Sequence, residues 1–287
     1  MQKIIIVALF LVFSMHLTAQ EKKAFKIFNA KGHKTSYKKI LKKALKADIV
    51  LFGEYHDNPI IHWLQYELTM DLAKEKTLTL GAEMVKTEDQ QHLNNYLKGE
   101  ITFRTLDSIF TKWNNFVTDY KPLVDIAKKK NFEFIATNVP RRISRLVFKG
   151  GFKVLDTMSD TDKQWFSPLP IDYDETLPGY VKMKTMLGKH ALVNLPKAQA
   201  LKDATMAFNI LKNKKENQIF VHYNGCYHSD YKEGIYWHLK KSNPDLNILT
   251  ISASEQTTIE ALDADVLGKA DFIIAVPDSM TKTYIGY

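Results

Sequence analysis

The chain has 287 residues, of which 45% are hydrophobic and 25% are charged, and its net charge at pH 7 is +8. A chain of this length can bury the core of one large domain, or of one domain with an insertion. Because Cys226 is the single cysteine, an intramolecular disulfide framework is excluded, and stability must come from the core.

The positive charge does not indicate a nucleic-acid partner. In residues 36–46 the apolar side chains fall on one face of a helix and the lysines on the other, which is typical of a helix with one solvated face. The lysines at 128–130 and 212–215 lie where helices are expected to end, a favourable place for positive charge. Since no arginine-rich patch with interleaved aromatic residues occurs, we expect no binding to nucleic acid.

The first 19 residues are typical of a secretory signal peptide. Lys3 gives a positive start, residues 4–12 are almost entirely apolar, and residues 17–19 offer a small residue for cleavage. The apolar run is short for a membrane span, and no cysteine stands at the cleavage point to carry a lipid. We therefore expect an exported domain, 20–287, in the periplasm or outer envelope without an obvious lipid anchor.

Buried strands alternate with helices along most of this domain. The alternation predicts an α/β fold with a mostly parallel sheet flanked by helices. A region without strand patterning, at about 150–217, predicts a smaller helical insertion or cap subdomain that ends in a helix at 196–212. The expected strands are 49–52, 77–84, 132–138, 218–225, 247–252 and 271–276, and the other main helices are 59–74, 87–97, 105–110, 122–130, one that begins near 141, and 234–240.

Polar side chains follow three of the predicted strands directly. Glu54 and His56 come after the first strand, Glu83 ends the second, and His228 lies just beyond the fourth. Ligands of open parallel sheets bind at the carboxyl ends of the strands, so we expect these side chains to converge. Two carboxylates and two imidazoles could bind a divalent metal ion, or act on a water molecule as a base and acid pair. Each residue alone also has a structural explanation, such as a hydrogen-bonded buried carboxylate or a histidine in a turn.

Several segments, taken in order, carry a resemblance that covers most of the domain. They resemble the ChaN family of haem-binding uptake proteins, which shares a superfamily with the Tiki-type proteases and the erythromycin-esterase-like proteins. The resemblance implies a parallel α/β sheet with a smaller helical domain, in agreement with the pattern of elements. The matching positions are 53–58 with His62 and Gln65, 83–84, 138–141, Gln199, 202–207 and 224–228.

The resemblance implies an exported protein that binds haem and takes part in haem or iron uptake at the bacterial envelope. Its expected partners are haem or another small molecule, the envelope uptake machinery, and a second copy of the chain that shares a flat exposed haem. Since no Cys-x-x-Cys-His motif is present, the haem is expected to be bound non-covalently. Arg141 is the candidate for a haem propionate, and the candidates for the iron ligand are Tyr55, His56, Tyr223, Tyr227 and His228.

The alternative function is a divalent-metal-dependent hydrolase, because relatives in the superfamily use the matching acid and histidine positions. Glu54, His56, Glu83 and His228 are then the candidate catalytic residues and metal ligands, and Mn, Fe or Zn would suit their donor atoms. No Gly-x-Ser-x-Gly motif is present, and Cys226 is better explained as an inert turn residue than as a nucleophile. The sequence leaves open whether the protein is an enzyme.

Overall fold

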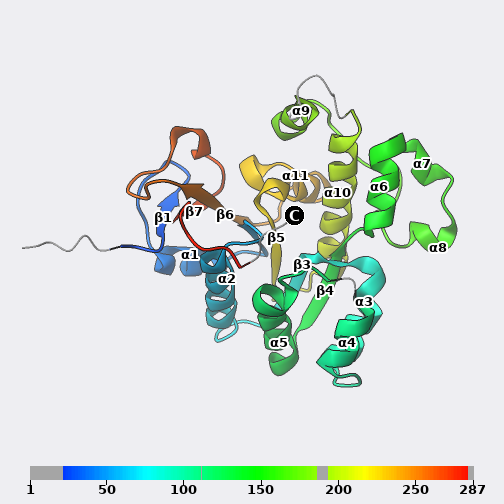
Figure 1. Ribbon diagram of the computed structural model, residues 1–287, viewed down its shortest axis with the longest axis horizontal. Coiled ribbons are helices and arrows are strands. Elements are labelled where there is room, and N and C mark those ends of the chain that lie inside the picture. The colour runs from blue at the N-terminus through cyan, green and yellow to red at the C-terminus, as the bar shows by residue number, and fades with distance from the viewer. Residues whose placement is uncertain (1–21, 111, 186–192, 284–287) are drawn as a thin grey trace, which may run out of the picture.

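The computed structural model describes residues 22–110, 112–185 and 193–283, in which seven strands form one sheet (Figure 1). The strand order is β1-β7-β6-β2-β5-β3-β4, and every neighbouring pair is parallel except β1 with β7. The predicted α/β fold with a mostly parallel sheet flanked by helices is confirmed. The strands are β1 (Lys26–Asn29), β2 (Ile49–Glu54), β3 (Leu78–Lys86), β4 (Glu133–Asn138), β5 (Ile219–Gly225), β6 (Ile248–Gln256) and β7 (Phe272–Pro277).

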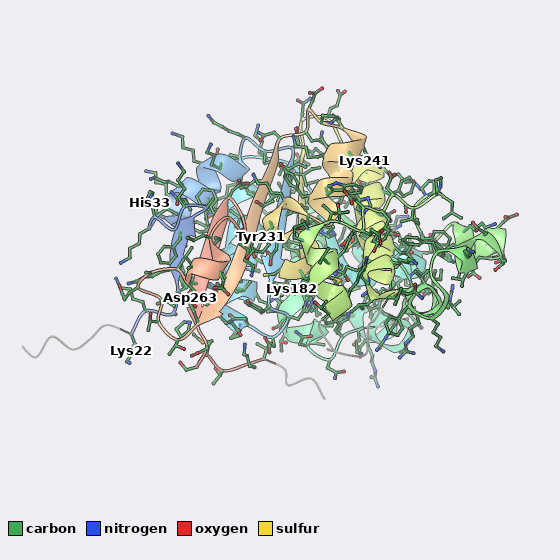
Figure 2. All side chains as sticks on the ribbon, turned by 90° about the horizontal axis from the view of Figure 1, so that it is seen from above. Lys22, His33, Lys182, Tyr231, Lys241 and Asp263 are labelled. Atoms are coloured by element: carbon green, nitrogen blue, oxygen red, sulfur yellow. The ribbon has the colours of Figure 1, made fainter. Side chains whose placement is uncertain are left out.

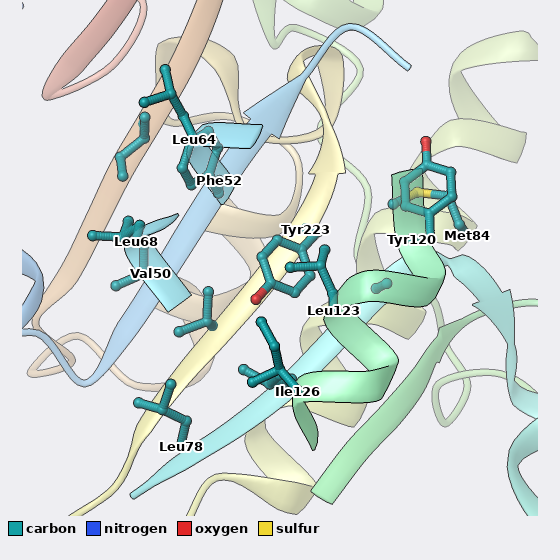
Figure 3. Packing of buried hydrophobic residues seen from close by; sticks show 14 of the residues in the cluster. Val50, Phe52, Leu64, Leu68, Leu78, Met84, Tyr120, Leu123, Ile126 and Tyr223 are labelled. Atoms are coloured by element: carbon teal, nitrogen blue, oxygen red, sulfur yellow. The ribbon is translucent and has the colours of Figure 1, made fainter. Parts of the chain in front are cut away.

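One face of the sheet packs against helices from the first half of the chain. Val50 and Phe52 of β2 and Tyr223 of β5 point to this face, because side chains alternate along a strand. They meet apolar side chains such as Leu68 and Ile126 in the cluster drawn in Figure 3. The helices on this side are α1 (Tyr37–Ala44), α2 (Pro59–Leu72), α3 (Gln90–Leu97), α4 (Phe103–Ile109) and α5 (Lys121–Lys130).

The opposite face of the sheet packs against α10 (Leu195–Asn213) and α11 (Ile235–Ser242). Ile49 and Leu51 of β2 point this way and meet Met206 of α10. Because the sheet is covered on both faces, its strands are continuous apolar runs rather than alternating ones. This double cover explains why residues 49–52 could be identified as a strand from the sequence.

The region at about 150–217, predicted as a helical insertion, contains both peripheral and central elements. Helix α6 (Arg141–Gly150) packs on α10, and the short helix α7 (Lys153–Asp156) packs on α6. The helix α8 (Asp160–Lys163) lies farther from the sheet and has no buried residue, whereas α9 (Pro178–Thr185) packs on α10 (Figure 1). Their aromatic side chains pack largely on one another, and the Tyr173 and Tyr180 rings lie 5.4 Å apart. Helix α10 itself covers the sheet, so the end of this region is part of the main core.

Most lysine side chains of the described residues are spread over the surface, whereas Lys269 is buried. Lys22, Lys182 and Lys241 lie at separate places on the face that Figure 2 shows. In the described part of the chain, no helix combines the length and the apolar character needed to cross a membrane. The predicted signal peptide, 1–19, lies outside the described residues.

Candidate functional site

Glu54, the last residue of β2, is held by three side chains. It is 1% exposed, and its Oε1 lies 2.8 Å from His56 Nδ1 and accepts a hydrogen bond from the Tyr120 hydroxyl at 2.7 Å. Its Oε2 accepts a hydrogen bond from Gln65 Nε2 at 2.7 Å. Burial alone would raise the pKa of Glu54, but neighbouring His62 and the hydrogen bond with His56 outweigh it and lower the pKa. Glu54 is therefore a fixed, ionised carboxylate.

His56 is the more accessible member of this pair. Its side chain is 33% exposed, and its ring lies 4.5 Å from that of Trp113, centroid to centroid. Burial would lower the pKa of His56, but the hydrogen bond with Glu54 and the charge of Glu83 raise it. Within the described residues Nε2 has no hydrogen-bond partner, so this atom is available to a ligand.

A second cluster lies on the α10 side of the sheet edge. Glu83 of β3 accepts a hydrogen bond from the backbone N–H of Gly225 through Oε2 at 2.7 Å, and its Oε1 lies 3.1 Å from His228 Nε2. The other ring nitrogen of His228 lies 2.5 Å from Asp203 Oδ1, and Asp203 Oδ2 accepts a hydrogen bond from Tyr180. The imidazole is thus enclosed between two buried carboxylates.

The charges of this second cluster stabilise one another. Burial would lower the pKa of His228, but Glu83 and Asp203 outweigh it and raise the pKa to about 9. Burial would raise the pKa of Glu83, and the charge and hydrogen bond of His228 hold it well below its ordinary value instead. At neutral pH the cluster is an imidazolium between carboxylates, an arrangement that suits a structural ion pair.

Gly225, the last residue of β5, separates the two clusters. A Cβ at this position would lie 2.8 Å from His56 Nε2 and 3.4 Å from Glu83 Oε2. A side chain at residue 225 would therefore move the His56 ring away from its present place.

We expect Gly225→Ala to lower the free energy of unfolding by about 1–3 kcal/mol, since it overpacks a buried site. Urea unfolding measures the change. Gly179→Ala is the matched control, because its Cβ would meet only the flexible carboxylate of Glu233. Equal stabilities of the two variants would show that His56 can move at little cost.

The four predicted acid and histidine residues do lie at neighbouring strand ends, but as two internally bonded groups. Glu54 bonds His56, and Glu83 bonds His228, so the donor atoms face each other. Among residues 22–110, 112–185 and 193–283, no group of three or more His, Cys, Asp or Glu side chains is placed to hold a metal ion. The arrangement does not fit the divalent-metal site predicted from the sequence.

Two of the five predicted haem ligands are placed where they cannot reach a ligand. Tyr223 is fully buried beside Leu123 of α5, and its hydroxyl lies 2.6 Å from Thr69 Oγ1 (Figure 3). Its position within the strand sends its side chain into the core, away from a ligand at the edge of the sheet. His228 is 5% exposed with both ring nitrogens engaged, so it too cannot ligate iron in this arrangement.

The remaining candidates differ in accessibility. Tyr55 is partly buried beneath Lys269, whose Nζ lies 5.5 Å from the ring centroid, and it hydrogen-bonds the backbone of Glu255. Tyr227 lies in the turn η3 (Cys226–His228), is 40% exposed, and has a hydroxyl with no partner in the described part of the chain. Tyr227 and His56 are therefore the two exposed candidates.

Cys226 is buried beneath the same turn. Its sulfur lies 3.8 Å from the carbonyl oxygen of Ala253, and burial raises the pKa of the thiol to about 12. A protonated, enclosed thiol is a poor nucleophile, in agreement with its interpretation as an inert turn residue.

The segment after β7 fastens the loop that carries His56. The backbone N–H of Thr283 donates to the carbonyl of Asp57 at 2.9 Å, and Thr283 Oγ1 donates to Asp119 at 2.6 Å. Lys282 forms ion pairs with Asp57 and Glu255. The loop after β2 is thus tied to a distant part of the chain, because Thr283 and Asp57 are 226 residues apart in the sequence.

Sequence reasoning assigned no role to several residues around the site, although Gln65 and Lys202 are among the positions that match the family. Gln65 and Tyr120, which hold Glu54, reach it from α2 and from the π-helix η2 (Phe116–Tyr120), so only helix packing reveals them. Lys86 and Lys202 were also given no role, although the charges of Lys202 and Arg141 act on Lys86. The sequence signal for Lys86 was its position as a charged residue at the end of the apolar strand β3.

These features define an α/β protein with a polar site at the carboxyl edge of its parallel sheet. A family model described as haem-binding uptake, Tiki superfamily, ChaN matches residues 40–239. The chain therefore belongs to the ChaN family of haem-binding uptake proteins, as its motifs predicted.

Among solved structures, the chain is similar to ChaN of Campylobacter jejuni, whose structure shows cofacial haem binding. The TM-score is 0.66 at 21% identity, covering 89% of this chain and 98% of that one, which shows a shared fold. A succinoglycan biosynthesis protein matches with a TM-score of 0.49 at 12% identity over 84% of this chain and 90% of that one. The C-terminal region of Pasteurella multocida toxin matches with a TM-score of 0.46 at 14% identity over 88% of this chain and 28% of that one. No curated protein sequence matches the chain.

Proposed function

We propose that the protein binds haem non-covalently at the carboxyl ends of β2 and β5 and takes part in haem or iron uptake at the bacterial envelope. The observation that carries the proposal is Tyr227, a phenol that is 40% exposed in the turn just after β5, next to the central strand β2 of a haem-uptake fold. Phenolate oxygen is an established ligand of haem iron.

We propose that two further side chains at the same edge of the sheet contribute to the porphyrin site. His56 offers a free Nε2 from the neighbouring strand, and Trp113 adds an aromatic surface next to it. Burial raises the pKa of Tyr227, and Glu233 and Asp230 add to this, so the phenol keeps its proton at neutral pH. Binding of iron by Tyr227 would release this proton, because metal ligands bind in their deprotonated form.

The exposed position of Tyr227 also leads to a proposal about the partners of the protein. Because the turn is exposed, a haem held by it would keep one face open. A second copy of the chain or a component of the uptake machinery could cover this face, and we propose both as partners. Export of the mature domain, 20–287, is part of the same proposal, and recovery of a chain without residues 1–19 from the exported fraction of cells would test it.

The test is a haemin titration followed by absorbance, with the wild type, Tyr227→Phe and Tyr223→Phe. We expect a saturable Soret shift in the wild type and at least about tenfold weaker binding in Tyr227→Phe, or about 1.4 kcal/mol. Tyr223→Phe is the matched control, since it removes the same hydroxyl from the core and should bind as the wild type does. A wild type without a saturable shift would overturn the proposal, and equal binding by Tyr227→Phe would remove Tyr227 as the ligand.

A further inference from the structure

Three cationic side chains gather beside the proposed haem site, and we refer to Lys86, Arg141 and Lys202 as the basic cluster. Lys86 ends β3, Arg141 begins α6, and Lys202 lies on α10. Lys86 pairs with Asn138 across β3 and β4, and Arg141 follows Asn138 by three residues. Helices α6 and α10 pack together through a shared apolar cluster. The fold therefore holds the cluster at one edge of the sheet.

The charges of the basic cluster are left largely without counterions. The guanidinium of Arg141 and the ammonium of Lys202 form no ion pair with any residue of the described ranges. The ammonium of Lys86 donates to the backbone carbonyl of Glu83 at 3.1 Å, which leaves further N–H groups for a ligand. The next residue along, Arg142, behaves differently, because it forms ion pairs with Glu88 at 3.1 Å and Asp162 at 2.9 Å.

The pKa of Lys86 also shows the effect of the positive charges around it. Burial and the positive charges of Lys202 and Arg141 together lower the pKa of Lys86 to about 8, although Glu83 and Asp89 oppose them. Glu83 also forms an ion pair with His228 at 3.1 Å, so its single negative charge is shared between His228 and Lys86. An anion placed among the three cations would relieve their mutual repulsion.

The start of α6 adds to the attraction for an anion. The helix spans Arg141–Gly150, and its N-cap, Pro140, makes no side-chain hydrogen bond to the first turn. The first backbone N–H groups of a helix lack partners within the helix and carry partial positive charge. These N–H groups belong to the first turn of α6, and this turn begins with Arg141 itself.

We propose that Lys86, Arg141 and Lys202 form a carboxylate-binding subsite that takes the propionate groups of the haem held at Tyr227. The proposal rests on the proposed function. The strand order places β3 beside β5 and β4 beside β3, so the subsite lies one to two strand spacings, about 5–10 Å, from the end of β5. A porphyrin bound at Tyr227 could thus direct its propionates across β3 to the basic cluster. Arginine and lysine form charge-assisted hydrogen bonds with carboxylates, the strongest kind of hydrogen bond available here.

The test compares haemin with the dimethyl ester of the same iron porphyrin, in which the propionates carry no charge. We expect the wild type to bind haemin at least about tenfold more tightly than the ester. In the double variant Arg141→Gln, Lys202→Gln, this preference should fall to about twofold or less, because two of the three cations of the basic cluster are lost. The single variant Lys86→Met should reduce the preference in the same direction.

Arg142→Gln is the matched control, since it removes an adjacent arginine that already has carboxylate partners, and it should keep the full preference. Circular dichroism shows whether each variant folds. A wild type that binds haemin and ester equally, or a double variant that keeps the preference, would overturn the subsite and leave haem binding at Tyr227 standing. A wild type that binds neither porphyrin would overturn the proposed function itself.

Discussion

Replacement of Asp203 with alanine is expected to lower the free energy of unfolding by about 3–5 kcal/mol, because it removes one partner of a buried ion pair. Asp203 is fully buried, its Oδ1 lies 2.5 Å from His228 Nδ1, and its Oδ2 accepts the Tyr180 hydroxyl at 3.1 Å. The variant would leave a buried imidazolium and a buried hydroxyl without these acceptors. Urea unfolding of the wild type and the variant measures the loss.

Asp172→Ala is the control for this prediction. Asp172 pairs with Lys241 at 2.5 Å, but the side chains are 54% and 48% exposed, respectively. An exposed pair of this kind contributes about 0–1 kcal/mol. If Asp203→Ala cost no more than Asp172→Ala, the cluster of His228 with its two carboxylates would not be the ion pair that its geometry indicates.

The stability of the protein is expected to fall as the pH rises from 6.5 to 8. The pKa of His228 is raised from 6.5 to about 9, so the unfolded chain loses this proton in a range where the folded protein keeps it. The stabilisation is complete below pH 6.5 and is lost as the pH approaches 9. Over the interval from pH 6.5 to 8 this amounts to about 2 kcal/mol.

The upper limit of that interval is set by Lys86. Its pKa is lowered to about 8 in the folded protein, so above this pH the folded protein loses the Lys86 proton while the unfolded chain keeps it. The contribution of Lys86 to stability therefore rises with pH in this range. Unfolding free energies of the wild type and His228→Gln, measured at pH 6.5 and 8, test the prediction. The variant should lose most of the decline, and the smaller part that remains should come from His56, whose pKa is also raised. A decline as steep in His228→Gln as in the wild type would assign it to another group.

The strand ends could be predicted because strands buried on both faces leave continuous apolar runs in the sequence. Residues 49–52 form such a run, and β2 extends it by only two residues, to Glu54. The edge strand β1 left no comparable signal, because it has four residues and only Ile27 and Phe28 are buried. It forms by antiparallel pairing with β7, at the other end of the chain.

The contacts within the site could be predicted only in part. Their positions after predicted strands placed four side chains at one edge of the sheet, namely Glu54, His56, Glu83 and His228. The sequence could not show that these side chains pair with one another. That pairing depends on groups from α2, η2 and α10, and on the close approach of Gly225. The two tyrosines near the end of β5 show the same limit. Tyr223 falls within the strand and faces the core, whereas Tyr227 follows the strand and faces solvent.

The fastening of the His56 loop by Lys282 and Thr283 affects the thermodynamics of ligand binding. Ordering a free backbone costs about 1–2 kcal/mol of conformational entropy per residue. The loop at 55–58 loses this freedom when the protein folds, through the bonds of Thr283 to Asp57 and of the helix cap Asn58 to α2. A ligand at His56 therefore meets a preorganised surface, and little of its binding free energy is consumed in ordering the chain.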